Sequence, residues 1–158
     1  MKHILLYESY HNPLNQQYGA FATEIPSLRG DYERVASSYI DDLKKNYYTG
    51  KGKEFNKKIG NSSWYTKDFF RWCEIARMPC QIIYFPATKK AKDEHVAAYI
   101  DGWVIDFAHK QFSKNKKEEF KVSKKDLYKK YGYDVSKAEI FDEFPDWIEG
   151  IYPPRSKK

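Results

Sequence analysis

Two stretches of the chain carry apolar residues at helical spacing. Within residues 32–47 the apolar side chains recur every three or four positions, which predicts an amphipathic helix with Asp31 as its N-cap. Within about 63–77 an aromatic stripe at the same spacing predicts a buried central helix that Pro79 ends. The members of this stripe are Tyr65, Phe69, Phe70, Trp72, Cys73 and Ala76.

Short apolar runs predict strands at residues 2–8, 80–85 and 138–141, and a β-hairpin turns at Asp101-Gly102. This dipeptide favours the positive φ angles of a type I′ turn. The resulting register pairs residue 100 with 103, 99 with 104, 98 with 105 and 97 with 106. One side of the hairpin is then wholly apolar and is expected to face a core, with Val96, Ala98, Ile100, Trp103, Ile105 and Phe107.

The remaining segments are polar or charged. Residues 9–30, 48–62, 86–94 and 109–123 are expected to be loops, with a short helix near 124–131 and a turn at 146–148. The pattern predicts an α+β fold, a central helix packed against an antiparallel sheet, in one domain over 1–158. Residues 154–158 are expected to form a disordered basic tail.

Composition narrows the choice of partner and compartment. The net charge of +6 and pI near 9.1 are compatible with nucleic acid or an acidic protein, although much of the lysine excess suits a solvated surface. The chain has no apolar run long enough to cross a membrane, and its first apolar stretch is too short for a signal peptide. We therefore expect no membrane partner, and a reduced cytoplasmic setting with Cys73 and Cys80 as core thiols.

The other side of the hairpin carries candidate chemistry. There His95 and Asp106 are diagonal neighbours, and a carboxylate bonded to one ring nitrogen leaves the other as a base or acid. The hairpin side with this pair is expected to look toward the start of the central helix, where Ser62 and Ser63 would gain from the dipole and the unpaired N–H groups. The alternatives are a His–Asp pair that only stabilises the sheet and a serine that only caps the helix.

The chain resembles a known enzyme superfamily in residues 60–108. Asn61-Ser62-Ser63-Trp64-Tyr65 and the aromatic helix after it are similar to the nucleophile helix of papain-like cysteine hydrolases. The later strands with His95 and Asp106 resemble the transglutaminase and NlpC/P60 branches, in which Cys, His and Asp follow in that order. Residues 77–81, Arg-Met-Pro-Cys-Gln, also stand where transglutaminase-like proteins pass from this helix into a strand.

The resemblance implies a papain-like fold and a role for each matching residue. Ser63 occupies the position of the nucleophilic cysteine, His95 would be the general base and acid, and Asp106 the orienting carboxylate. Trp64 would form a wall of the cleft.

Further contacts with the substrate are expected from Asn61 and Tyr99. The family also implies a side-chain amide in the oxyanion hole, for which Asn56 and Asn61 are the candidates. No metal or organic cofactor is implied, and no Cys/His cluster has zinc-site spacing.

Serine at position 63 leaves three interpretations open: an engineered and inactivated Cys-to-Ser form, a natural serine hydrolase, or a degenerate relative that binds without turnover. Because Trp64, His95 and Asp106 are all retained, the first is favoured. The predicted function is a cysteine-peptidase-like hydrolase or acyl transferase that acts on amide or thioester bonds, with a protein or peptide substrate.

The alternative is a catalytically inactive binding protein on the same scaffold. It would contact nucleic acid or an acidic protein through the basic loops at 48–60 and 87–92, with Tyr47 and Tyr48.

Overall fold

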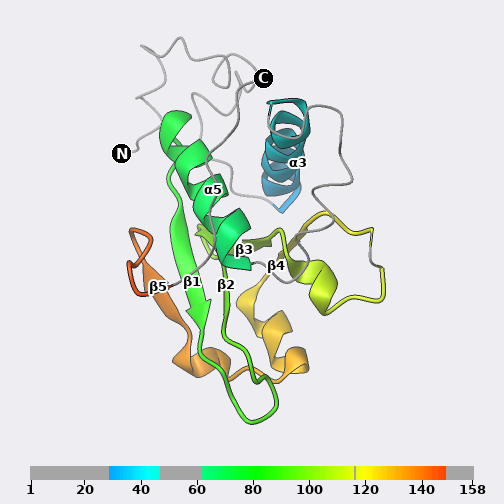
Figure 1. The fold of residues 1–158 in the computed structure, drawn as a ribbon, viewed down its shortest axis with the longest axis vertical. Coiled ribbons are helices and arrows are strands. Elements are labelled where there is room, and N and C mark those ends of the chain that lie inside the picture. The colour runs from blue at the N-terminus through cyan, green and yellow to red at the C-terminus, as the bar shows by residue number, and fades with distance from the viewer. Residues whose placement is uncertain (1–28, 47–61, 116, 149–158) are drawn as a thin grey trace.

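The computed structural model describes residues 29–46, 62–115 and 117–148, and these form an α+β fold (Figure 1). The predicted strand at 2–8, most of the loop at 48–62 and the tail at 154–158 lie outside the described residues. One antiparallel sheet has the strand order β4-β3-β2-β1-β5. Along the chain the elements are α3 (Arg29–Asn46), α5 (Ser62–Ile75), β1 (Gln81–Phe85), β2 (His95–Ile100), β3 (Trp103–Asp106), the 3-10 helix η2 (His109–Gln111), β4 (Lys121–Ser123), the 3-10 helices η3 (Lys125–Tyr131) and η4 (Val135–Lys137), and β5 (Glu139–Phe141).

Helix α3 confirms the first predicted helix but begins earlier than expected. Its first residue is Arg29, so Asp31 lies inside the first turn and pairs with Arg34. The prediction that Asp31 is the N-cap is therefore wrong. A carboxylate is favourable anywhere near the positive end of the helix dipole, so its presence alone does not distinguish the N-cap from the first turn.

Helix α5 confirms the second predicted helix, but Pro79 does not end it. The last helical residue is Ile75, and Arg77 has a left-handed φ of 55°. The N–H of Met78 then donates to the carbonyl of Cys73 at 2.8 Å, which closes the helix end. The backbone turns before the proline is reached, so Pro79 only follows a helix that has already ended.

The hairpin is confirmed in register and in turn type. Ile100 pairs with Trp103, and the two pairs beyond it are also as predicted. Asp101 and Gly102 have φ angles of 51° and 86°, the left-handed values that a type I′ turn requires. The predicted strands at 80–85 and 138–141 are confirmed as β1 and β5.

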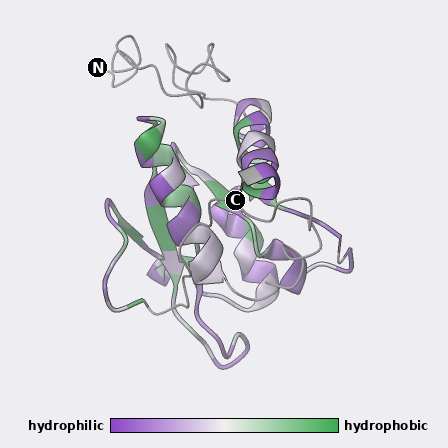
Figure 2. Cartoon of the chain, turned by 45° about the horizontal axis from the view of Figure 1, so that its top comes forward, coloured by the Kyte–Doolittle hydropathy of each residue, from purple (hydrophilic) through white to green (hydrophobic). Residues whose placement is uncertain are grey.

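Each face of the sheet is covered by a different core. The apolar side of the hairpin packs against α3 and α5, as predicted, through Ala98, Ile100, Ile105 and Phe107. The opposite side is covered by η3, η4 and the link between them, where Tyr128, Val135 and Tyr133 pack with Ala97 and Val104. In Figure 2 the strands carry much of the hydrophobic colour, whereas α3 alternates between hydrophilic and hydrophobic residues.

This arrangement corrects the expectation that the His95–Asp106 side of the hairpin faces the central helix. Helix α5 packs on the other side of the sheet, and only hydroxyl groups of its first turns, those of Ser62 and Thr66, reach the backbone of Val96 beside His95 among the hydrogen bonds of the described residues. Alternation within the hairpin shows which residues share a side, but it does not show which element covers that side. The aromatic face of α5 buries more apolar surface against the apolar side of the hairpin. The polar side is left for the C-terminal 3-10 helices.

The stretch at 109–123 was expected to be an irregular loop, but it contains η2 and strand β4. Strand β4 pairs with β3 through Lys121, Val122 and Ser123. Only one of these three residues is apolar, so alternation cannot reveal the strand from sequence. The expected helix near 124–131 is present as the 3-10 helix η3.

The two cysteines are free thiols, as expected of core residues. Cys73 is buried in the α3–α5 core and Cys80 is half-buried. Burial, and next the hydrogen bond with Cys80, raises the pKa of Cys73 well above its ordinary value. Within the described ranges, no helix combines the length and apolar character needed to cross a bilayer.

Candidate active site

A buried imidazole–carboxylate pair lies at one end of the sheet. His95 is the first residue of β2 and Asp106 is the last residue of β3, so the hairpin places them side by side. The Nε2 atom of His95 is 2.7 Å from Oδ2 of Asp106, and each side chain is only 1% exposed. The structure therefore brings together two of the three predicted triad residues.

The carboxylate of Asp106 accepts two further hydrogen bonds. The Tyr128 hydroxyl donates to Oδ2 at 2.6 Å, and the Ala108 backbone N–H donates to Oδ1 at 2.9 Å. Burial alone would raise the pKa of Asp106, but the charge of His95 and the hydrogen bonds outweigh it and hold this pKa below its ordinary value. Burial, and next the charge of Asp106, raises the pKa of Tyr128.

These protonation states fix the hydrogen on the imidazole. Asp106 is an ionised acceptor, so the His95 nitrogen that contacts it carries the proton. In a neutral ring the other nitrogen, Nδ1, then holds a lone pair and is the basic atom.

A glutamine amide faces that basic nitrogen. The Nε2 atom of Gln111 lies 3.4 Å from Nδ1 of His95 and donates to the Ala108 carbonyl at 3.1 Å. Gln111 belongs to η2, which follows β3 directly and returns the chain toward the start of β2. No spacing in the sequence points to this residue. The two amides that were expected near an oxyanion, Asn56 and Asn61, lie outside the described residues.

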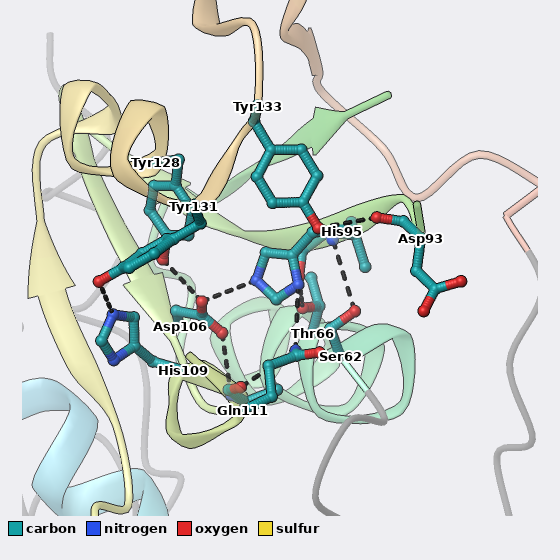
Figure 3. A network of polar contacts seen from close by, with 12 residues as sticks. Ser62, Thr66, Asp93, His95, Asp106, His109, Gln111, Tyr128, Tyr131 and Tyr133 are labelled. Atoms are coloured by element: carbon teal, nitrogen blue, oxygen red, sulfur yellow. Dashed lines mark hydrogen bonds and ion pairs between the residues drawn. The ribbon is translucent and has the colours of Figure 1, made fainter. Parts of the chain in front are cut away.

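The start of α5 reaches the same end of the sheet. The hydroxyl of Ser62, the first helical residue, accepts a hydrogen bond from the Val96 N–H at 3.4 Å. One turn later the Thr66 hydroxyl donates to the Val96 carbonyl at 3.2 Å. Positions four apart lie on one face of a helix, so these two contacts fix α5 to the residue that follows His95. In Figure 3, Ser62 and Gln111 lie below the imidazole of His95, and Asp106 lies to its left.

The other predicted site residues occupy different environments. Ser63 is half-buried at the second position of α5. Trp64 is 1% exposed and packs edge-on against Tyr65 in the α3–α5 core, so its ring is enclosed by protein. Tyr99 is half-buried four residues beyond His95 on the same strand, about 13 Å along it. Asn61 lies outside the described residues.

Aromatic rings surround the imidazole of His95. Phe112 meets it edge-on with ring centroids 5.0 Å apart, and Tyr128 stacks on it at 5.7 Å. Phe85 and Tyr133 lie 6.3 Å away. This shell keeps water from the pair and strengthens the electrostatic contacts inside it.

A second imidazole–carboxylate pair adjoins the first. Nδ1 of His109 lies 3.1 Å from a carboxylate oxygen of Glu118, and its Nε2 lies 2.7 Å from the Tyr131 hydroxyl. Tyr128 and Tyr131 are three residues apart on η3, and side chains at this spacing align on a 3-10 helix. Each tyrosine therefore serves one of the two pairs (Figure 3).

The ring of Phe112 links the two pairs. Tyr131 stacks on it with centroids 4.5 Å apart, and the same ring meets both His95 and His109 edge-on. None of these second-pair residues was predicted from the sequence, which offered only a polar stretch at this point.

The arrangement as a whole provides an oriented base beside the N-terminus of a helix that begins with two hydroxyl groups. The residues that the structure describes contain no cluster of three or more His, Cys, Asp or Glu side chains suited to a metal ion. Comparisons of the chain with family models, with curated proteins and with solved structures found no match.

Proposed function

We propose that this protein is a hydrolase or acyl transferase of papain-like arrangement, acting on amide or thioester bonds through a serine at the start of α5. The observation that carries the proposal is the buried 2.7 Å contact between His95 and Asp106, which leaves Nδ1 as a base. Helix α5 begins at this same end of the sheet, where the Ser62 hydroxyl contacts Val96.

The reaction follows from these positions. The serine oxygen forms a bond to the substrate carbonyl carbon, its proton passes to Nδ1 of His95, and the carbonyl π electrons move onto oxygen. Asp106 stabilises the imidazolium without taking its proton. When the bond to the amine or thiol breaks, the proton on Nδ1 goes to that leaving group, and water or an acceptor repeats the steps in reverse.

In this reaction the oxyanion is stabilised by backbone N–H groups at the start of α5, where the helix dipole is positive. Among the described residues, Gln111 is the side-chain amide that lies beside the base.

Two serines compete for the role of nucleophile. Ser63 holds the position that the resemblance assigns to it, immediately before Trp64. Ser62 is a second candidate, because its hydroxyl contacts the backbone of the residue next to His95. If Ser62 only ties the helix to β2, Ser63 is the reactive residue.

Cysteine substitution tests the proposal and identifies the serine. Ser62→Cys and Ser63→Cys variants are prepared in a Cys80→Ala background, and their rates of alkylation by iodoacetamide are measured from pH 5 to 9. The remaining native thiol, Cys73, is buried and should not interfere. A thiol paired with His95 is ionised at pH 7, whereas an ordinary thiol is only a few per cent ionised, so the reactive variant gains about thirtyfold in rate.

Each reactive variant is paired with the same variant carrying His95→Gln, and that advantage is expected to disappear. If both cysteine variants react at the same rate with and without His95, the base does not serve either position and the proposed mechanism is wrong.

A second candidate function is binding without turnover. It is favoured by the near-complete burial of His95 and Asp106, which also suits a pair that only stabilises the sheet. Exposed lysines occupy positions within the segment 89–92 and on the outer side of η3. The two groups are adjacent, because Lys90 lies against Gly132 at the end of η3. Binding of a fluorescent oligonucleotide that falls steeply from 50 to 200 mM salt, together with no His95-dependent reactivity, would favour this function.

A further inference from the structure

We infer that Gln111 is a positioning residue that covers the basic nitrogen of His95 in the resting protein and holds the ring as its Nε2–H tautomer. The catalytic consequence of this inference depends on the proposed function, but the tautomer does not. Gln111 Nε2 lies 3.4 Å from Nδ1, the one ring nitrogen that Asp106 does not contact.

A closed ring of contacts holds the imidazole from both sides. The Ala108 N–H donates to Oδ1 of Asp106, and the Ala108 carbonyl accepts from the Gln111 amide. The backbone of Ala108 therefore positions both groups that contact the ring, Asp106 at Nε2 and Gln111 at Nδ1. An amide nitrogen has two hydrogens, so one satisfies Ala108 and the other is directed at Nδ1.

The amide can only donate through this nitrogen, so the contact is a hydrogen bond only with the form of the ring in which Nδ1 carries no proton. A nitrogen that accepts a hydrogen bond carries no proton, so the contact favours the neutral ring. Asp106 faces the ring from β3, and the phenols of Tyr128 and Tyr133 face it from the C-terminal segment. Before the ring accepts a proton from the nucleophile, Gln111 must release Nδ1.

This device has an unusual consequence: removing the amide makes the base more available. Gln111→Met keeps the length of the side chain without its donor. Nδ1 then loses a hydrogen bond whose net contribution corresponds to about fivefold in an equilibrium, so its lone pair is more available to the nucleophile by up to this factor. Gln111→Glu places a carboxylate at Nδ1, and this acceptor favours a hydrogen on that nitrogen.

Nitrogen NMR of ring-labelled histidine measures the tautomer directly. We expect one protonated nitrogen, Nε2, in the wild type and in Gln111→Met, and a proton on Nδ1 in Gln111→Glu. The matched control is Gln81→Met, which removes an amide bonded to Asp142 at 2.8 Å and should leave His95 unchanged. Protonation of Nδ1 in the wild type, or an unchanged His95 in Gln111→Glu, would overturn the inference.

Reactivity separates positioning from a merely structural role. In the reactive cysteine variant, Gln111→Met should raise the alkylation rate about two- to fivefold at the acidic end of the pH range, where the thiol is only partly ionised, whereas damage to the site would lower it. A lower rate overturns the covering role. If no cysteine variant depends on His95, the proposed function fails, and the NMR result still decides whether Gln111 holds the tautomer.

Discussion

The hydroxyl of Tyr128 offers a measurable test of the buried network. Tyr128→Phe removes the 2.6 Å hydrogen bond to Asp106 but keeps the ring, which stacks on Phe85 with centroids 4.6 Å apart. A hydrogen bond to a charged group contributes about 1.5–3 kcal/mol, so we expect the free energy of unfolding to fall by about 2 kcal/mol. Urea unfolding at pH 7, followed by circular dichroism, measures this loss.

The same substitution also changes the response to acid. The pKa of Asp106 is lowered in the folded protein, so its stabilising contribution is complete above the ordinary carboxyl range and is lost as the pH falls through the lowered value. Tyr128 is one cause of that lowering. Without its hydroxyl, the folded-state pKa of Asp106 rises toward its ordinary value, so the loss of stability in acid is smaller and is complete at a higher pH.

A double-mutant cycle with Asp106→Asn shows whether the effect passes through the carboxylate. With a neutral partner the cost of Tyr128→Phe should fall below about 1 kcal/mol. Tyr131→Phe is the matched control, since its hydroxyl contacts His109 and its acid response should follow the wild type. A cost under about 0.5 kcal/mol, or an equal cost in both backgrounds, would refute the reasoning.

Three further predictions concern backbone geometry and thiol access. Gly132→Ala should lower stability by about 2 kcal/mol in urea unfolding, because φ is +99° and the new Cβ would lie 2.7 Å from Cβ of Lys90; wild-type stability would contradict this. Gly102→Ala, with φ +86° but only a side-chain atom at 3.5 Å, should cost less, about 1 kcal/mol, and a larger loss than at position 132 would be inconsistent with the space described. A disulfide reagent should modify Cys80 before Cys73, whose thiol is buried with a raised pKa, and peptide mapping that finds the reverse order would exclude this burial.

Local pattern was enough to predict the parts of the fold that depend on short-range physics. Alternation and the Asp101-Gly102 pair predicted the hairpin, its register and its apolar side, because the side-chain period of a strand is two. The same register placed His95 beside Asp106. Helical spacing found α3 and α5, since each buries one continuous stripe of residues.

Features that depend on distant packing could not be predicted. Which side of the sheet α5 covers is decided by competition with η3 and η4, whose residues follow the hairpin by many positions. Gln111 and Tyr128 reach the pair through turns that have no sequence signature. The burial of the pair likewise comes from Phe112 and Tyr133, whose positions only the folded chain defines.

The two phenols of η3 have a consequence for how this segment can change. Tyr128 and Tyr131 reach different partners because their spacing equals one turn of the 3-10 helix. Inserting or deleting a single residue between them would rotate one hydroxyl by about a third of a turn and separate it from its partner. Substitutions on the outer surface of this segment should therefore be tolerated far better than any alteration of its length.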